Sequence, residues 1–315
     1  MKEAIVLSLL FSIVGLSSAN ADPFRDFMSA GHSLQDLSVQ DAVLPEAVVN
    51  TADKNVFRVD PRILGGNSVD ISDYPWQVAL IRGYAKDPLR SQFCGGSLIA
   101  PNVVVTAAHC IDNAIVRKDA TRIDVIAGTA FYASDGERLK VASIIIHPQW
   151  NPTNQDYDIA VLKLKSSSVL GKPIPLYTSP IKTLDHAWVS GWGALFEGGS
   201  SSPDLVAADV PVITSSVCNQ EASYKGNVTL RMMCAGKRDG GLDSCQGDSG
   251  GPLVANFDGK QQLIGIVSWG EGCARRDKYG VYTRISEMVP WITSLVGDKL
   301  ANSSNNQMVS FNSFR

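Results

Sequence analysis

The sequence predicts an all-β fold, and three observations favour this class. Short apolar runs follow one another from residue 74 onward, many of them are rich in Val and Ile, and Gly, Pro, Asn and Asp lie between them. Short strands at such regular spacing are typical of a sandwich or a barrel. Examples of these runs span residues 76–81, 97–99, 103–106, 122–127, 141–146, 160–164, 187–190, 263–268 and 280–284.

Two segments have the spacing of helices. Residues 287–296 place apolar side chains at helical intervals, and Gly297 follows as a stop, so we expect a helix near the end of the chain. Residues 34–49 could form a short helix that Pro45 interrupts. Residues 298–315 are rich in Asn and Ser and are expected to form a loose tail.

The composition is that of an ordinary globular protein with no sign of a nucleic-acid or anionic-membrane partner. Of the 315 residues, 44% are hydrophobic and 19% are charged. Residues 1–62 hold 5 basic and 8 acidic residues, and by difference from the totals of 28 and 31 the rest of the chain holds 23 of each. The formal net charge of −3 therefore lies entirely in the first 62 residues.

Residues 1–21 match a secretory signal peptide. Lys2 gives a short basic region, residues 5–16 are apolar, and Ala19-Asn20-Ala21 fits a cleavage site. A membrane anchor is the alternative, but the apolar stretch is short for a bilayer and no later segment is apolar enough to span one. We therefore expect a secreted protein, extracellular or, in a bacterial host, periplasmic, with no membrane span after signal removal.

The six cysteines all lie beyond residue 93. An even count in an exported protein indicates three disulfides, and counting alone leaves about 15 pairings open. The chain has no Cys-x-x-Cys pair and no histidine cluster, so neither a metal site nor a cofactor is expected.

Residues 241–252 carry the clearest chemistry, in the stretch Gly-Leu-Asp-Ser-Cys-Gln-Gly-Asp-Ser-Gly-Gly-Pro. Ser249 stands among glycines, which allow backbone conformations that a side chain forbids. A serine hydroxyl is a poor nucleophile and needs a base and an oriented partner. The chain offers both, because His109 follows the run 103–106 and Asp158 precedes the run 160–164.

Each partner has a competing interpretation. His109 also fits a packed core histidine, because small residues surround it, and Asp156 competes with Asp158 on spacing alone. Among the other histidines, we expect His147 and His186 to be structural or solvated.

The order His109, Asp158, Ser249, with Gly-Asp-Ser-Gly-Gly-Pro around the serine, resembles the trypsin-like serine proteases of the chymotrypsin family over residues 63–296. The resemblance implies two six-stranded antiparallel β-barrels with the active site in the cleft between them, plus a C-terminal helix. It identifies residues 63–297 as the protease domain, and it favours Asp158 over Asp156.

The resemblance also assigns the catalytic roles. His109 would be the general base, Asp158 would orient its imidazole, and Ser249 would attack the peptide carbonyl. The backbone N–H groups of Gly247 and Ser249 would form the oxyanion hole.

The family's specificity pocket maps onto a further set of residues. Asp243, six residues before Ser249, would lie at its base and favour Arg or Lys before the cut bond, with Ser244 beside it. The other substrate-binding positions are Ser268, Trp269, Gly270 and Gly280. The implied partners are proteins or peptides with Arg or Lys at that position, and protein inhibitors of proteases.

A zymogen is implied by Arg62, which precedes Ile63-Leu64-Gly65-Gly66. Cleavage there would free an ammonium group on Ile63 that could pair with Asp248, and residues 22–62 would be an activation propeptide. The alternative is that Arg62 is merely exposed and Asp248 a turn residue.

The disulfide pairing implied by the resemblance is Cys94–Cys110, Cys218–Cys234 and Cys245–Cys273. The loop after Gly128 lacks the spaced acidic residues of the family's calcium loop, so no calcium is expected. A catalytically inactive relative that acts as a binding module, and a narrow processing protease in place of a broad digestive one, are the alternative functions; the intact His109, Asp158 and Ser249 argue against the first.

Overall fold

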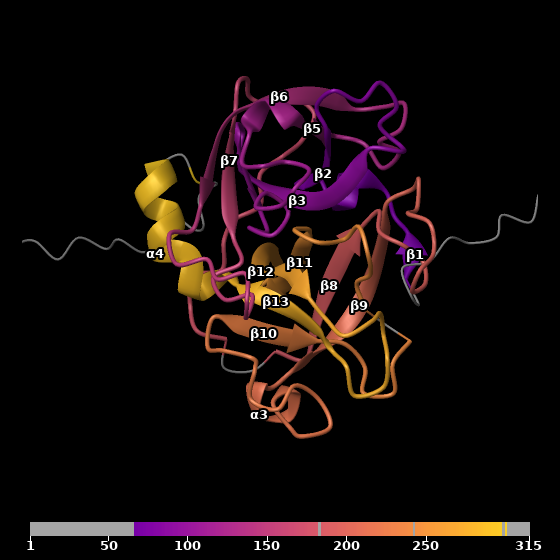
Figure 1. Ribbon diagram of the computed structural model, residues 1–315, viewed down its shortest axis with the longest axis vertical. Coiled ribbons are helices and arrows are strands. Elements are labelled where there is room, and N and C mark those ends of the chain that lie inside the picture. The colour runs from indigo at the N-terminus through magenta and orange to yellow at the C-terminus, as the bar shows by residue number, and fades with distance from the viewer. Residues whose placement is uncertain (1–65, 182–183, 242, 298–299, 301–315) are drawn as a thin grey trace, which may run out of the picture. The chain divides into compact units, whose positions relative to one another are not determined.

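The structure is a computed structural model that describes residues 66–181, 184–241, 243–297 and 300 (Figure 1). The signal peptide, the expected helix within 34–49, Arg62 and Ile63 lie outside the described residues, as does nearly all of the tail.

The first half of the described chain forms a closed antiparallel barrel. Its six strands pair in the order β2-β3-β4-β7-β6-β5, and β5 pairs back onto β2. The strands are β2 (Gln77–Arg82), β3 (Gln92–Ala100), β4 (Val103–Thr106), β5 (Ile123–Ala127), β6 (Glu137–Ile146) and β7 (Ala160–Leu164).

The second half forms a second six-stranded antiparallel ring, in the order β9-β10-β13-β12-β11-β8, which the pairing of β8 with β9 closes. The short strand β1 (Asn67–Ser68) adds to β9. The strands are β8 (His186–Gly191), β9 (Val206–Ile213), β10 (Met232–Ala235), β11 (Pro252–Phe257), β12 (Lys260–Trp269) and β13 (Gly280–Arg284). The all-β prediction with two barrels is confirmed; Figure 1 shows the first barrel above the second.

A single large hydrophobic cluster joins the two barrels. It contains side chains of the first barrel such as Val78 and Leu162, side chains of the second such as Leu263, and Met288 of the helix, all fully or almost fully buried. Strands such as β2 (Gln-Val-Ala-Leu-Ile-Arg) and β4 (Val-Val-Val-Thr) are buried at consecutive positions, because both of their faces are covered. Burial of this shared surface holds the two barrels against each other.

The expected C-terminal helix is present as α4 (Ile285–Val296), and it begins two residues earlier than predicted. Ile285, Met288, Ile292 and Val296 are its buried residues, at the three- and four-residue spacing of one helix face. Gly297 ends it with a positive φ of 58°. The shorter helix α3 (Ser215–Cys218) begins after Thr214, whose hydroxyl accepts from Val217 N–H.

The structure contains the three disulfides that the resemblance implied: Cys94–Cys110, Cys218–Cys234 and Cys245–Cys273. Each closes a loop of 16 to 28 residues and stabilises the fold by about 2–4 kcal/mol, in large part by restricting the unfolded chain. Within the described residues, no helix has the length and apolar character needed to cross a membrane.

Candidate active site

Strand register brings His109 and Asp158 together. Strands β4 and β7 pair so that Thr106 lies opposite Ala160. His109 follows β4 by three residues and Asp158 precedes β7 by two, so both leave the first barrel at the same edge. Ser249 comes from the second barrel, in the loop that precedes β11.

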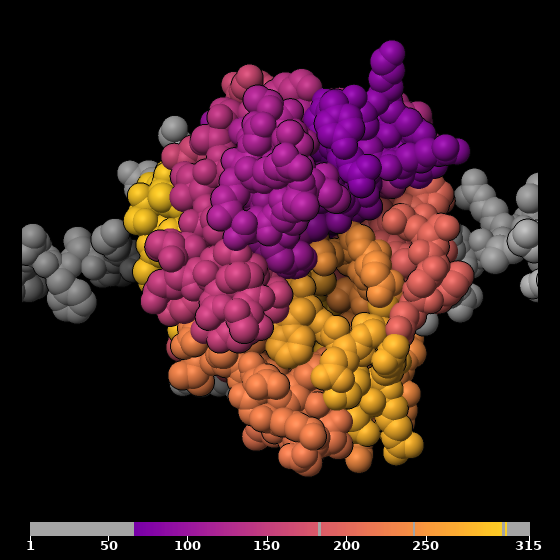
Figure 2. All heavy atoms as spheres, viewed as in Figure 1, coloured from indigo at the N-terminus to yellow at the C-terminus, as the bar shows by residue number. Residues whose placement is uncertain are grey.

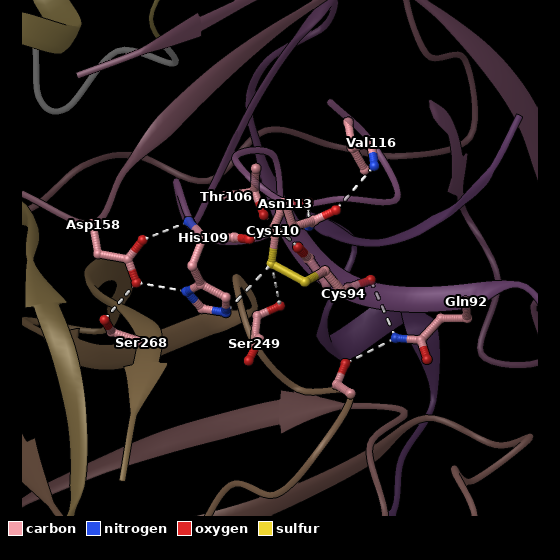
Figure 3. The surroundings of a disulfide bond; sticks show 12 residues. Gln92, Cys94, Thr106, His109, Cys110, Asn113, Val116, Asp158, Ser249 and Ser268 are labelled. Atoms are coloured by element: carbon pink, nitrogen blue, oxygen red, sulfur yellow. Dashed lines mark hydrogen bonds and ion pairs between the residues drawn. A yellow bond between two sulfur atoms is a disulfide. The ribbon is translucent and has the colours of Figure 1, made fainter. Parts of the chain in front are cut away.

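The Asp158 carboxylate is fully buried and accepts three hydrogen bonds (Figure 3). Its Oδ1 accepts from the His109 backbone N–H at 2.9 Å, and its Oδ2 accepts from His109 Nδ1 at 2.7 Å and from Ser268 Oγ at 2.5 Å. The Thr283 hydroxyl donates to the Asp158 backbone carbonyl at 2.7 Å. Ser268 lies on β12 and Thr283 on β13, so the second barrel holds the side chain of Asp158 through one residue and its backbone through the other.

The carboxylate determines which nitrogen of His109 carries the proton. Nδ1 donates to Asp158, so Nε2 of the neutral ring is left as the acceptor. Nε2 and the Ser249 backbone oxygen lie 3.7 and 3.6 Å from the same atom, Cys110 Sγ (Figure 3). Among the described residues, no hydrogen bond joins Ser249 Oγ to Nε2; such bonds often form only in the complex with substrate.

Only glycine fits at position 250, next to Ser249, because a side chain there would collide with neighbouring atoms. Gly250 has a φ of +80°, and a Cβ there would lie 2.2 Å from Thr106 Oγ1 and 2.6 Å from the Gly95 carbonyl oxygen. Gly250 N–H donates to Val267 O at 2.8 Å, and Gly95 N–H donates to Ser249 O at 2.8 Å. The loop that carries Ser249 thus makes hydrogen bonds with both barrels.

Hydrogen bonds to the neighbouring carbonyl oxygens set the direction of the Gly247 and Ser249 N–H groups. The Gln246 carbonyl accepts from Ala194 N–H at 2.7 Å, and the Asp248 carbonyl accepts from the backbone N–H three residues on at 2.8 Å. In a trans peptide the next N–H points away from the carbonyl, and the described residues contain no cis peptide. Gly247 and Ser249 therefore direct their N–H groups away from these partners, and in the described part of the chain neither has an acceptor.

Asp248 is fully buried beside the serine. Its Oδ1 accepts from Gly193 N–H at 2.8 Å and its Oδ2 from Cys245 N–H at 2.9 Å. Burial raises the pKa of Asp248 to about 6, although these two hydrogen bonds lower it. A Cβ on Gly191 or Gly193 would lie 2.2 or 2.5 Å from the carboxyl group. No cationic side chain of the described residues pairs with it, and Ile63 lies outside them.

A pocket of about 200 Å³ lies next to Ser249 and is lined by every residue predicted for substrate binding. These are Asp243, Ser244, Ser268, Trp269, Gly270 and Gly280. Figure 2 shows a hollow where the orange and yellow segments of the second barrel meet the surface of the first.

Asp243 is the buried acidic group of this pocket, with 3% of its surface exposed. Its oxygens accept from Ser244 N–H at 2.8 Å and Ala274 N–H at 3.3 Å. Burial raises the pKa of Asp243 to about 7, and the charge of Asp248 adds to the rise, while the hydrogen bonds oppose it. A Cβ on Gly280 would lie 2.3 Å from Asp243 Oδ1, so only glycine there leaves the carboxylate open to a ligand.

The other histidines in the described residues lie apart from this site. His147 is buried, stacked on Tyr157 and close to Trp291. His186 pairs with Asp209 at an exposed position. Cys94, His109 and Cys110 are the one group in the described residues with metal-ligand proximity, but both sulfur atoms are in a disulfide and offer no thiolate.

Several residues of the site were absent from the sequence-based prediction. They include Gly191 and Gly193 around Asp248, Thr283 behind Asp158, and Gln92, whose side chain reaches the Gly247 carbonyl. No local motif marks them, since Thr283 and Gln92 contact residues 125 and 155 positions away.

Comparison with known proteins finds a family model, Trypsin, that matches residues 63–292. The chain is 40% identical over 242 residues to anionic trypsin of Canis lupus familiaris, which covers 75% of this chain and 90% of that protein. It is 40% identical over 245 residues to Serine protease 1 of Homo sapiens, with 76% and 92% covered. Transmembrane protease serine 5 of Homo sapiens is 37% identical over 248 residues, with 76% and 52% covered.

Proposed function

We propose that this chain, which belongs to the trypsin family of serine endopeptidases, cleaves peptide bonds after Arg or Lys. We further propose that it does so with His109, Asp158 and Ser249, and that it is secreted as a zymogen. The observation that carries the specificity is the buried Asp243 carboxylate in an open pocket beside Ser249.

In the proposed reaction, Ser249 Oγ attacks the carbonyl carbon of the substrate and its proton passes to His109 Nε2. The carbon–nitrogen bond then breaks, the same proton goes to the leaving amine, and an ester remains on Ser249. Water repeats these steps on the ester and frees the second product. The hydrogen bond that His109 Nδ1 donates to Asp158 Oδ2 supports the role of His109, because it holds the ring and stabilises its protonated form.

The N–H groups of Gly247 and Ser249 are proposed to bind the negatively charged oxygen of the tetrahedral intermediate. Their orientation away from the partners of the neighbouring carbonyls supports the proposal. Each such donor is typically worth about 10²–10³ in rate.

The pocket favours a cationic side chain for reasons of charge and space. A guanidinium or ammonium group would neutralise the Asp243 carboxylate, which is otherwise costly to bury in ionised form. Gly270 has open space where a side chain would stand, since the nearest atoms to a Cβ there lie 3.8 Å away. Ser244 Oγ lies 3.4 Å from Asp243 Oδ1 and can accept a hydrogen bond from a lysine ammonium.

Matched peptide substrates that differ only in the residue before the cut bond test the proposal. For the protein cut between Arg62 and Ile63, we expect kcat/KM for Arg and Lys to exceed that for Gln or Phe by at least about 10²-fold, the scale set by an unpaired buried charge. Labelling of Ser249 by a serine-directed organophosphonate, absent in Ser249→Ala, checks the nucleophile. Equal rates for Arg and Phe would contradict the specificity, and no labelling would contradict the mechanism.

Secretion and activation complete the proposal. Residues 1–21 support export, and Arg62 before Ile63 supports cleavage by a protease of this specificity, including a second copy of the enzyme. The buried Asp248, whose only partners in the described chain are backbone N–H groups, supports a role for a new cation beside the serine loop.

A further inference from the structure

We propose that Gln92, on the first barrel, is a positioning residue for the oxyanion hole of the second. This inference rests on the proposed roles of the Gly247 and Ser249 N–H groups. It adds a side chain that touches neither the substrate nor the reacting atoms, and that acts by holding the peptide between the two donors.

The Gln92 amide is aimed at the serine loop. Its Nε2 donates to the Gly247 carbonyl oxygen at 2.8 Å and to the Cys94 carbonyl oxygen at 3.1 Å (Figure 3). Two carbonyl acceptors require the NH₂ end of the amide at this place. Gln92 Oε1 is buried without a partner in the described residues, so the amide keeps an unsatisfied acceptor in order to make these two bonds.

The Gly247 carbonyl belongs to the peptide that links the two oxyanion donors. The carbonyl oxygens of residues 246–249 each accept from a donor, and among the described residues only the one on Gly247 accepts from a side-chain N–H or O–H. In chain order the donors are Ala194 N–H at 2.7 Å, Gln92 Nε2 at 2.8 Å, Gly251 N–H at 2.8 Å and Gly95 N–H at 2.8 Å. Substitution can therefore remove the Gly247 bond without altering the backbone.

Gly247 is the residue at which this bond matters most. Its φ is +98°, and without a side chain its backbone torsions are less restricted than those of its neighbours. The Gln92 bond fixes the plane of the Gly247–Asp248 peptide, and with it the angle between the N–H groups before and after that plane. Once the bond is lost, the two donors need not converge on one oxygen atom.

The same strand makes a second contact with the loop. Gln92 begins β3, and Gly95 of β3 donates to the Ser249 carbonyl. One strand of the first barrel thus holds the loop of the second at residues 247 and 249. Stabilisation of the transition state then depends on this inter-barrel contact as well as on the loop itself.

The informative variant is Gln92→Glu, which keeps the size of the side chain and removes the N–H donor. We expect kcat of the cut enzyme on an arginyl amide to fall about tenfold or more, with KM changed less than about twofold, because one misplaced donor is worth up to about 10²–10³. Gln92→Ala should behave alike. Gln261→Glu, the same change at an exposed position of β12, is the control and should match the wild type.

Two inhibitors separate positioning from a general structural effect. A peptidyl arginine aldehyde forms a tetrahedral adduct with Ser249 and so needs the oxyanion hole, whereas benzamidine needs only the pocket. We expect Gln92→Glu to weaken the aldehyde about tenfold or more and to leave the Kd of benzamidine unchanged. Unchanged aldehyde affinity, or an equal loss for both inhibitors, would overturn the inference.

The outcome also distinguishes this inference from the proposed function. A wild-type enzyme that is inactive and unlabelled would refute the serine mechanism itself. An active wild type with Gln92→Glu and Gln92→Ala indistinguishable from it would refute only the role of Gln92.

Discussion

Arg231, just before β10 of the second barrel, forms an ion pair with Asp156, two residues before Asp158 on the first. Arg231 Nε donates to Asp156 Oδ1 at 3.1 Å, Nη2 contacts Oδ2, and the Thr229 hydroxyl donates to Oδ1 at 2.9 Å. Between the two aspartates Tyr157 has a φ of +55°, and its ring lies between His147 and the Arg231 guanidinium. The ion pair therefore supports a strained turn next to the candidate active site.

Removing Arg231 should destabilise the protein. The Asp156 side chain is only 10% exposed, so Arg231→Ala leaves a nearly buried carboxylate without its cation. We expect a loss of about 2 kcal/mol, less than for a fully buried pair because Arg231 is 30% exposed. Urea denaturation at neutral pH measures it, and Asp156→Asn in the same protein should restore part of the loss. A single variant as stable as the wild type would contradict this account.

Asp156 also illustrates where sequence reasoning reaches its limit. Spacing alone could not separate Asp156 from Asp158, and the structure turns the first toward Arg231 and the second toward His109. The partner of Asp156 lies 75 residues away, and that of Asp158 lies 49 away. Such pairings follow from strand order and register, which a local pattern does not contain.

The strands also differ in how well a local sequence pattern predicts them. Short, mainly apolar runs predicted β4 and β7 with their observed bounds, because such runs have few other places to be buried. Strand β9 is not among the runs named as examples from the sequence; Asp209 and Pro211 interrupt its apolar pattern, and Pro is normally a strand breaker. The Pro211 carbonyl nevertheless accepts from Gly236 N–H at 2.9 Å, so the strand continues across it.

Binding of a cation to the pocket should weaken as the pH falls below about 7. The pKa of Asp243 is raised to about 7, chiefly by burial, and only its ionised form neutralises a bound cation. A proton therefore competes with the ligand, and the Kd of benzamidine should rise about tenfold per pH unit well below that value. Calorimetric titration between pH 5 and 9 provides the measurement. Asp243→Asn should bind weakly at every pH, and a pH-independent Kd in the wild type would refute the competition.

The uncut chain should lose stability as the pH rises through about 6. Burial raises the pKa of Asp248 to about 6 from an unfolded value near 3.8, so folding favours its protonated form. The stability that this group contributes is complete below about pH 4 and is lost as the pH climbs through its folded pKa; a shift of about 2 units corresponds to about 3 kcal/mol. Asp243 acts in the same direction, so the comparison must isolate Asp248.

The test uses a Ser249→Ala background, which prevents self-cleavage. Urea denaturation from pH 4 to 8 should show a smaller decline in the free energy of unfolding for Asp248→Asn than for its parent. Identical slopes would show that Asp248 ionises in the uncut chain without penalty.

Cleavage between Arg62 and Ile63 should make the ionised Asp248 stabilise the fold instead of destabilising it, over a limited range of pH. The new Ile63 ammonium is expected to pair with Asp248, which would raise the pKa of the ammonium and lower that of the carboxylate. The active form should then be stable across neutral pH and should be lost as the pH climbs through the raised pKa of the ammonium. Cleavage at Arg58 would not suffice, because Val59 as the first residue would stand four positions too early.

The test begins with N-terminal sequencing of the active species. The Arg62→Gln variant should stay nearly inactive, and Arg62→Lys, which keeps a cleavable cation, is its matched control. A fully active Arg62→Gln protein with residues 22–62 still attached would refute the zymogen mechanism and leave the assignment of His109, Asp158 and Ser249 standing.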